Sequence, residues 1–458
     1  VSSALSSYFD AAGHDLRVLM PYYASLQTAG LEIEIVPELQ DLELELDGST
    51  VNYWIVRARS ESGGADIYLL QCPELFGGEE LYGGDDEHLR FILLSRAAIE
   101  MCQKTSFAPD IFHSHDWHTA LIPLYLKSTY SWDRLFRNTR SVLTIHNIGY
   151  QGVFGTEILE QAGLSESTGM LDQDDLQGGR VNFLKTGVIH ADLLTTVSPT
   201  YAREIMEPQY GMGLEGKLRD REGLVAGILN GVDYAEWSPE SDPLIPFPYS
   251  VDDLSGKRKN KQALMEEMGL DCPLETPLVG MITRLTYQKG IDLVLDMMPG
   301  ALRSRDFALV VLGSGDEEYE QAFNWLQSEF PGRVGFYQGF SNELAHRIEA
   351  GSDAFLMPSR YEPCGLNQMY SLRYGTVPVV RATGGLADSV QHFDPVTGKG
   401  TGVVFHDFDA NGLRWAVDQV LDMYGNRHSW SQWMVTGMKK DYSWNDQGRL
   451  YIDRFRTL

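Results

Sequence analysis

Cysteine is scarce in this 458-residue sequence, and so is positive charge. The four cysteines, Cys72, Cys102, Cys272 and Cys364, are scattered and form no C-x-x-C pair, which argues against a disulfide framework or a zinc site and favours a reducing compartment. No apolar run reaches about 18 residues, so no membrane span is expected. The chain has 37 Lys and Arg against 64 Asp and Glu, a net charge of -27, which argues against a nucleic-acid-binding protein, since such a protein would show a basic face.

The acidity of the chain also bears on the ligands that it can hold. An anionic substrate has to be bound by local positive groups, because the net field of the protein repels it. Basic residues in glycine-rich loops therefore carry more weight here than in a neutral protein. A hydrophobic content of 43% with 22% charged residues is ordinary for a globular chain with sizeable cores. The length indicates about three domains, or two large α/β domains.

Short apolar runs alternate with helical patterns in two successive sets. The first set extends from a strand at 16–20 to one at 224–229, with strictly alternating runs in 31–72 that predict an antiparallel patch. Around 232–260 periodicity is lost and prolines accumulate, as in an interdomain crossing, and a second set begins at 278. The sequence therefore predicts an α/β fold with two doubly wound domains.

We expect the first domain to comprise residues 1–228 plus 440–458, and the second to comprise 229–439. The chain begins at Val1 without a methionine, so we expect the first strand and its βα loop to precede it. This loop matters because in doubly wound folds it often carries ligand-binding glycines.

The stretch from Ser359 to Val390 reads as a loop, a helix, a strand, and a glycine turn that opens another helix. Pro378 counts somewhat against the strand, because proline removes one ladder donor. Glu362 comes just before the first helix, and Thr383-Gly384 just before the second. Two helix N-termini beside strand ends favour a phosphate; the alternative is a βαβ unit whose glycines only permit turns.

Two cations, Arg284 and Lys289, lie in one predicted strand-to-helix loop. In so acidic a chain we interpret them as a diphosphate clamp, the alternative being a pair of solvated surface charges. Gly313-Ser314-Gly315 follows the next strand but lacks the third glycine of a dinucleotide fingerprint. A nicotinamide oxidoreductase is therefore disfavoured.

A histidine-rich segment, HSHDWH, follows the strand that begins at Ile111. Its spacing resembles the H-x-H-x-D-H of some metallo-hydrolases, but Asp116 stands one place early and no second ligand set follows. We expect a polar strand-end loop, with Asp116 able to bind sugar hydroxyls, and no metal. His146 ends the next predicted strand and points to the same edge of the sheet.

Long stretches of the chain resemble the bacterial-type glycogen synthases and the starch synthases of plastids. These are HSHDWHTAL, TIHNIGYQGVF, ILNGVD, TRLTYQKGIDL, SRYEPCGLNQMYSLRYGTVPVVRATGGLADSV and DYSW, in the order of the family. The resemblance implies a GT-B fold, two Rossmann-like domains facing a central cleft. It also implies a retaining glucosyltransferase that moves glucose from ADP-glucose, or UDP-glucose, to the non-reducing end of an α-1,4-glucan. No cofactor is implied, and the compartment would be a bacterial cytoplasm or a plastid.

The resemblance also implies roles for individual residues. Glu362 matches the acidic residue near the transferred glucose, His146 the histidine that faces the sugar, and Arg284 and Lys289 the cations on the diphosphate. The expected catalytic set is Glu362, His146, Arg284, Lys289 and Asp116. The expected substrate-binding set is Tyr82, Asn230, Phe340, Cys364, Gly365, Leu366, Asn367, Thr383 and Gly384, with Phe340 against the base.

The sequence departs from the family pattern in three places. The K-x-G-G-L loop is not found, because Val1 stands after its expected position. Related GT-B enzymes carry two glutamates in the pattern E-x7-E, and this chain has Tyr370 in place of the second. Ala382 occupies a position that is often basic. Two other functions stay open: a GT-B transferase with a small acceptor, and a catalytically weak glucan-binding or priming protein. For catalysis we expect the acceptor to attack from the face of the leaving diphosphate, since no side chain is an evident nucleophile.

Overall fold

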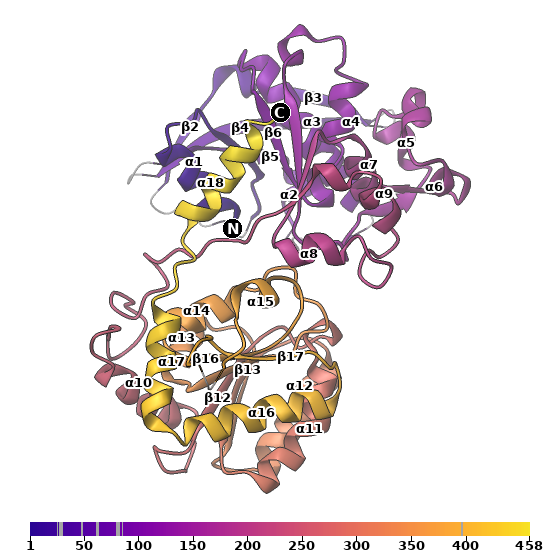
Figure 1. Cartoon of the computed structure of the whole chain (residues 1–458). Helices are drawn as coiled ribbons and strands as arrows, with labels where there is room; N and C mark the ends of the chain where they lie inside the picture. Colours follow the sequence, from indigo (N-terminus) through magenta and orange to yellow (C-terminus); the bar gives the residue numbers. More distant parts are fainter. Residues whose placement is uncertain are drawn as a thin grey trace. The chain divides into compact units, whose positions relative to one another are not determined.

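The computed structural model describes residues 1–24, 26, 31–46, 49–60, 64–78, 83–84, 86–394 and 397–458. The chain forms two compact units, coloured along the sequence in Figure 1. The first comprises Val1–Val197, Ala202–Ile228 and Gly448–Leu458, and the second comprises Ser198–Tyr201 and Leu229–Gln447. These units differ from the predicted ranges in two places, because Ser198–Tyr201 belongs to the second unit and the return to the first begins at Gly448. None of the helices in the described part of the chain combines the length and hydropathy that a bilayer crossing needs.

The first unit contains a mixed sheet and a parallel sheet. The mixed sheet has the order β1-β5-β4-β2, with β3 paired to β4, and the parallel sheet has the order β11-β10-β7-β6. The antiparallel patch predicted for 31–72 is confirmed, since β2, β3 and β5 each pair antiparallel with β4. The strands are β1 (Arg17–Pro21), β2 (Leu31–Ile35), β3 (Leu42–Leu46), β4 (Ser49–Ser60), β5 (Asp66–Gln71), β6 (Ile111–His115), β7 (Arg140–Ile145), β10 (Leu193–Thr196) and β11 (Val225–Gly227), with a hairpin of β8 (Val153–Gly155) and β9 (Arg180–Asn182).

Helices of the first unit connect these strands. They are α1 (Ser2–Ala11), α2 (Pro73–Phe76), α3 (Glu87–Lys104), α4 (Ile122–Lys127), α5 (Ile158–Gln161), α6 (Gln173–Gln177), α7 (Phe183–His190), α8 (Pro199–Glu204, whose first turn belongs to the second unit) and α9 (Glu215–Arg219). Short 3-10 turns are η1 (Pro37–Leu39), η2 (Trp117–Thr119), η3 (Arg134–Phe136), η4 (Ser165–Met170) and η5 (Glu222–Leu224).

The second unit is built on one parallel six-stranded sheet of order β14-β13-β12-β15-β16-β17. In chain order this is 3-2-1-4-5-6, the order of a doubly wound nucleotide-binding fold. Its strands are β12 (Leu278–Ile282), β13 (Ala308–Gly313), β14 (Val334–Gln338), β15 (Ala354–Met357), β16 (Val377–Arg381) and β17 (Val403–Phe405). Its helices are α10 (Ser255–Glu267), α11 (Ile291–Ser304), α12 (Glu317–Glu329), α13 (Asn342–Gly351), α14 (Asn367–Arg373), α15 (Gly384–Ser389), α16 (Ala410–Tyr424), α17 (Arg427–Met438) and the start of α18 (Trp444–Phe455), with η6 (Tyr287–Lys289) before α11.

Alternate residues of the central strands enter two separate cores, one on each face of this sheet. In β13, Leu309 and Val311 join the core of α11, α12, α16 and α17, whereas Val310 and Leu312 join the core of α10 and α13. Side chains of a strand point to opposite faces in turn, so an apolar strand covered by helices on both sides buries every residue. All six residues of β13 are buried.

Pro378 is tolerated inside the sheet because of its place in the ladder. It is the second residue of β16 and lies opposite Phe355 of β15. Pairing of β16 with β17 begins only at Val379. The missing N–H therefore falls where one of the two ladders has not started, which explains why this proline does not interrupt β16.

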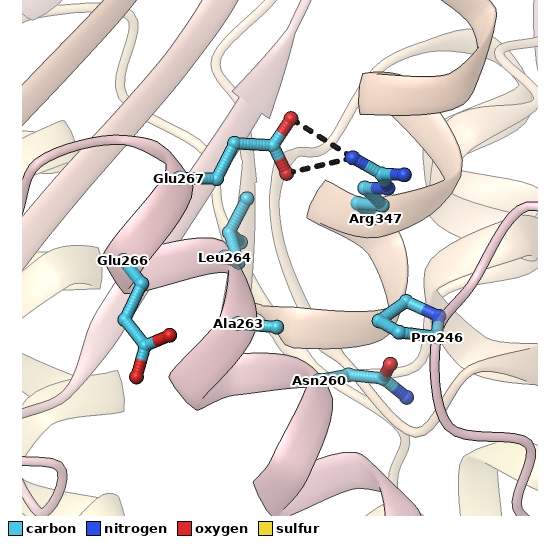
Figure 2. A pocket seen from close by; sticks show the side chains of 7 residues that line it. All are labelled: Pro246, Asn260, Ala263, Leu264, Glu266, Glu267 and Arg347. Carbon is cyan, nitrogen blue, oxygen red and sulfur yellow. Dashed lines mark hydrogen bonds and ion pairs between the residues drawn. The ribbon is translucent and has the colours of Figure 1, made fainter.

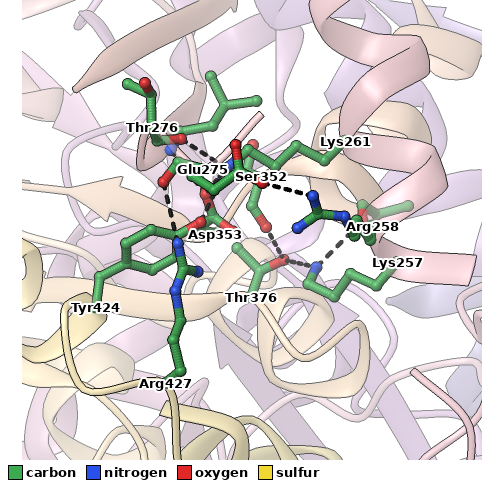
Figure 3. A network of polar contacts seen from close by, with 12 residues as sticks. Lys257, Arg258, Lys261, Glu275, Thr276, Ser352, Asp353, Thr376, Tyr424 and Arg427 are labelled. Carbon is green, nitrogen blue, oxygen red and sulfur yellow. Dashed lines mark hydrogen bonds and ion pairs between the residues drawn. The ribbon is translucent and has the colours of Figure 1, made fainter. Parts of the chain in front are cut away.

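A buried polar network joins α10 to the amino ends of the strands (Figure 3). The ammonium of Lys261 donates to the carbonyl of Thr276, to Oδ2 of Asp353 and to the hydroxyl of Tyr424. Lys257 donates to the hydroxyl of Thr376 at 2.8 Å. Because a buried cation is costly unless it is paired and hydrogen-bonded, these contacts fix α10 against the sheet, on the edge away from the candidate site.

Candidate active site

A cavity of about 460 Å³ opens in the second unit at the carboxyl ends of β12, β13 and β15. In an open parallel sheet ligands bind at this edge, where the strand order reverses. Nine residues predicted from the sequence line it together: Asn230, Arg284, Lys289, Phe340, Glu362, Cys364, Gly365, Leu366 and Asn367. Residues that were not predicted also line it, among them Thr283, Ser314 and Ser359.

Glu362 and Lys289 form a close ion pair in this cavity. Oε2 of Glu362 lies 2.6 Å from the Lys289 ammonium and accepts the hydroxyl of Ser359 at 2.8 Å. Glu362 is only 5% exposed. A carboxylate that accepts two donors, one of them charged, is held in a fixed position.

Positive charge and free N–H groups remain at the cavity for an anion. Within the part of the chain that the structure describes, the guanidinium of Arg284 has no hydrogen-bond or ion-pair partner. The backbone N–H groups of Gly365, Leu366 and Asn367 likewise donate to no acceptor among the described residues. An unpaired guanidinium beside unpaired amides, in a strongly acidic chain, provides what a diphosphate requires.

Another hollow of the second unit, of about 470 Å³, has no such free charge (Figure 2). Its cation, Arg347, binds both carboxylate oxygens of Glu267 at 3.0 and 3.1 Å and also pairs with Glu343. Since Arg347 is already neutralised by two carboxylates, this hollow is a poor site for an anionic ligand.

Asn230 and Cys364 form a polar wall of the cavity. The side-chain oxygen of Asn230 is buried and accepts no hydrogen bond from the described residues. The backbone N–H of Asn230 contacts the Cys364 thiol, and burial raises the pKa of that thiol to about 12. The thiol is therefore protonated near neutral pH and is not a nucleophile.

Thr383 and Gly384 do not line the cavity, but Gly384 packs closely against the backbone of Glu362, which does. A Cβ on Gly384, whose φ is +43°, would lie 1.9 Å from the carbonyl oxygen of Glu362. The N–H of Gly385 donates to that same carbonyl at 3.1 Å. Only glycine permits so close an approach, so this turn positions the backbone of Glu362.

Phe340 is 86% exposed at the rim of the cavity. Tyr370, which replaces the second acid of E-x7-E, lies elsewhere: its ring stacks on Trp237 at 3.9 Å, and His346 stacks on Trp237 at 3.7 Å. Burial raises the pKa of Tyr370. Tyr370 is thus part of an aromatic stack and not of the cavity lining.

Asp116 and His146 meet in the first unit, at the carboxyl ends of the adjacent strands β6 and β7. Oδ1 of Asp116 accepts the N–H groups of His146 at 2.7 Å and of Asn147 at 3.4 Å. Asp116 has a φ of +54°, which is unusual for a residue other than glycine. Burial raises the pKa of Asp116 to about 6. This carboxyl therefore fixes the loop that carries His146.

The imidazole of His146 contacts a second imidazole, a feature that the sequence did not reveal. Nδ1 of His115 and Nε2 of His146 are 3.0 Å apart. Burial lowers the pKa of His115 to about 3 and that of His146 to about 4. Both rings are neutral near pH 7, so one nitrogen donates and the other accepts. Tyr82, the remaining predicted residue, lies outside the described residues.

The described residues include no group of three or more His, Cys, Asp or Glu side chains placed to hold a metal ion. For the histidine-rich segment, the geometry explains why. His115 contacts His146, and Nε2 of His113 contacts the hydroxyl of Thr144 at 2.6 Å. These nitrogens serve hydrogen bonds within the sheet edge.

Comparison with known proteins relates both units to one family. The model of the starch synthase catalytic domain matches residues 1–220, and that of the glycosyl transferases group 1 matches residues 269–433. A glycogen synthase of Koribacter versatilis is 46% identical over 394 residues, covering 85% of this chain and 81% of that protein. A glycogen synthase of Thermotoga maritima is 41% identical over 464 residues, covering 100% and 94%.

A solved structure extends this similarity to the fold. The catalytic domain of starch synthase IV from Arabidopsis thaliana, bound to ADP and acarbose, has a TM-score of 0.92 and 31% identity, covering 100% of this chain and 94% of that one. Sucrose-phosphate synthase from Thermosynechococcus elongatus shares the fold at a TM-score of 0.58 and 17% identity. The chain therefore belongs to the glycogen and starch synthase family, with the two Rossmann-like domains of a GT-B glycosyltransferase.

Proposed function

We propose that the chain transfers glucose from ADP-glucose to the non-reducing end of an α-1,4-glucan, with retention of configuration. Its family makes it a glycosyltransferase that elongates glycogen or starch. The observation that carries the proposal is the cavity in which Arg284, without a partner among the described residues, lies with the Lys289–Glu362 pair. The ADP in the related starch synthase structure supports ADP-glucose. The compartment, bacterial cytoplasm or plastid, stays a prediction.

In this proposal the cavity binds the sugar donor through separate groups. Arg284, Lys289 and the amides of residues 365–367 bind the diphosphate, and Phe340 stacks on the base. Asn230 and Glu362 accept hydroxyls of the glucose, and Cys364 contacts it with an uncharged thiol. Gly384 keeps the backbone of Glu362 in place, and Thr383 stays a proposed substrate contact. Tyr82 stays a proposed sugar contact.

Transfer breaks the bond between the anomeric carbon and the diphosphate oxygen and forms one to the acceptor oxygen. The acceptor attacks from the face of the leaving group, and a diphosphate oxygen takes its proton. Negative charge grows on the diphosphate as the bond breaks, so preorganised cations and N–H groups stabilise the transition state more than the ground state. Losing one such group typically costs about 10²–10³ in rate. In this proposal no metal ion is required to stabilise the leaving diphosphate. Loss of activity with EDTA and its recovery with Mg²⁺ would refute the metal-independent mechanism.

Two residues of the first unit, His146 and Asp116, also have proposed roles. A neutral imidazole near pH 7 can hydrogen-bond a sugar hydroxyl without bringing a charge that would have to be compensated. Asp116 acts on His146 through the backbone, since its Oδ1 accepts the His146 N–H. We assign Asp116 a positioning role, and a glucosyl adduct trapped on Asp116 or Glu362 would refute the same-face mechanism.

The test is radiolabelled transfer to glycogen and to maltooligosaccharides from ADP-glucose and from UDP-glucose. We expect elongation of both acceptors, preference for ADP-glucose, and α-linked products by NMR. Lys289→Ala should lose most activity, while Lys259→Ala, an exposed lysine outside the cavity, should not. Transfer to a sugar phosphate in place of glucans would favour the small-acceptor enzyme, and glucan binding without transfer would favour the priming protein.

A further inference from the structure

The two carboxylate oxygens of Glu362 have different surroundings. Oε2 accepts the Lys289 ammonium at 2.6 Å and the Ser359 hydroxyl at 2.8 Å. No group among the described residues donates to Oε1, although Glu362 lines the cavity. We propose that Ser359 is a positioning residue that, with Lys289, holds Oε2 so that Oε1 alone accepts one hydroxyl of the transferred sugar. This inference rests on the proposed function and concerns how that site selects its sugar.

Ser359 is placed for this contact by the fold of its loop. It follows β15 after Pro358, at the carboxyl end of the strand, and is 2% exposed. Its hydroxyl donates to Glu362, three residues later in the same loop. A buried hydroxyl has to find an acceptor or lose the free energy of its hydration. Here that acceptor is the carboxylate itself, so the bond fixes the plane of the carboxylate.

The loop of Lys289 is attached to the same segment. The N–H of Arg360 donates to the carbonyl of Gln288 at 2.8 Å. The Arg360 guanidinium lies 3.6 Å from the ring of Tyr287 and 4.1 Å from that of Phe408. These contacts join the residues just before Lys289 to the residue just after Ser359, so the two groups that bind Oε2 keep their separation.

Ser359 and Lys289 do not contribute in the same way. An ammonium is a compact charge that attracts a carboxylate without fixing its plane, since its three donors rotate. A hydroxyl on a short buried side chain offers one directed bond. Without Ser359 we therefore expect Glu362 to stay paired with Lys289, but its carboxylate to rotate. Oε1 would then no longer be held where it accepts the sugar hydroxyl.

The consequence is selectivity for one hydroxyl of the glucose. A site that is built to hydrogen-bond a substrate hydroxyl discriminates strongly against an analogue that lacks it. With Oε2 occupied, Glu362 has one oxygen left, so it discriminates against a sugar that lacks the hydroxyl at one position of the ring. A carboxylate that is free to rotate should discriminate less against such an analogue.

The experiment compares Ser359→Ala, Ser359→Thr and, as matched control, Ser328→Ala, an exposed serine of α12. Transfer is measured from ADP-glucose and from its four monodeoxy analogues, and binding of ADP and of each sugar donor by calorimetry. We expect Ser359→Ala to lower kcat with ADP-glucose about 10–100-fold, with the Kd for ADP unchanged. The loss should vanish for the one analogue that lacks the hydroxyl bound by Oε1, and Ser359→Thr should restore most activity.

Equal losses with all five sugar donors, weaker ADP binding, or no loss at all would overturn the inference. If wild type transferred nothing from any sugar donor, the proposed function would fail. The ratio of Kd values for ADP-glucose and its analogues would still test the inference. It should fall towards one in Ser359→Ala, and an unchanged ratio would refute the role of Ser359.

Discussion

Replacing Lys289 with methionine should destabilise the second unit as well as slow transfer. The side chains of Lys289 and Glu362 are 18% and 7% exposed. Lys289→Met keeps the apolar stem but leaves the carboxylate with the Ser359 hydroxyl alone. Removing one partner of a buried ion pair typically costs about 3–5 kcal/mol. Because Lys289 is partly exposed, solvent screening reduces this to about 2 kcal/mol. For a domain of this size the midpoint of unfolding should fall by about 4–8 °C.

The double variant Lys289→Met/Glu362→Gln separates the structural from the catalytic role of the pair. It removes both charges of the pair, so its midpoint should be close to that of Glu362→Gln, and the two single effects should not add. Transfer should be low in all three variants, because the diphosphate has lost a cation or the sugar has lost its carboxylate.

Differential scanning calorimetry gives the midpoints, and radiolabelled transfer gives the rates. Lys259→Met is the control, because this lysine is exposed and forms no ion pair with any of the described residues. If the midpoint losses of the two single variants summed in the double variant, the pair would not be coupled, and the reasoning from its burial would be wrong.

Three further predictions concern other contacts. Burial raises the pKa of Glu349 to about 8, so the folded state keeps a proton that the unfolded state releases above pH 4.5. This group should therefore lower stability by about 1.4 kcal/mol per unit as pH rises from 5 to 7; Lys257, whose pKa burial lowers to about 7, acts only above that range. Thermal unfolding of Glu349→Gln between pH 5 and 7 should show no such loss of stability, whereas the exposed control Glu318→Gln should show the same loss as wild type. If the stability of wild type did not fall over this range, the prediction would be contradicted. Gly384→Ala should lower the free energy of unfolding by about 2 kcal/mol more than Gly398→Ala. Gly398 is the control because its φ is also positive, but a Cβ there would meet no atom of the other described residues within 4 Å. Equal unfolding midpoints would show that the contact with Glu362 does not matter. Phe340→Ala should raise KM for ADP-glucose about 10-fold with little change in kcat, Tyr337→Ala being the exposed control, and a lower kcat at constant KM would remove Phe340 from base binding.

Much of the cavity could be predicted because parallel strands bring their loops to one edge. Arg284 and Lys289 follow β12, and Glu362 follows β15, its neighbour in the sheet. Short, continuous apolar runs were enough to predict these strands, and the positions of Arg284, Lys289 and Glu362 followed from where the strands end. The charge balance of the chain indicated that such cations bind an anion.

Other features depend on backbone geometry that a local pattern does not contain. The hydrogen bond from Ser359 to Glu362 requires one particular loop conformation, and the hydrophobic periodicity of a sequence does not predict loop conformations. The sequence predicted that Asp116 binds sugar hydroxyls, which stays a prediction, but it did not reveal that Oδ1 accepts two backbone amides or that the residue has a φ of +54°. Tyr370 stacks on Trp237, more than one hundred residues earlier in the chain, a contact that only the tertiary fold creates.

The account depends on a diphosphate held by fixed cations and backbone amides. Calorimetric titration of ADP in the presence of EDTA tests this most directly, with wild type and Arg284→Ala side by side. We expect wild type to bind without added metal and Arg284→Ala to bind about 10–100-fold more weakly, the value of a charge-assisted hydrogen bond. Equal affinities, or wild-type binding that appears only when Mg²⁺ is added, would contradict the account.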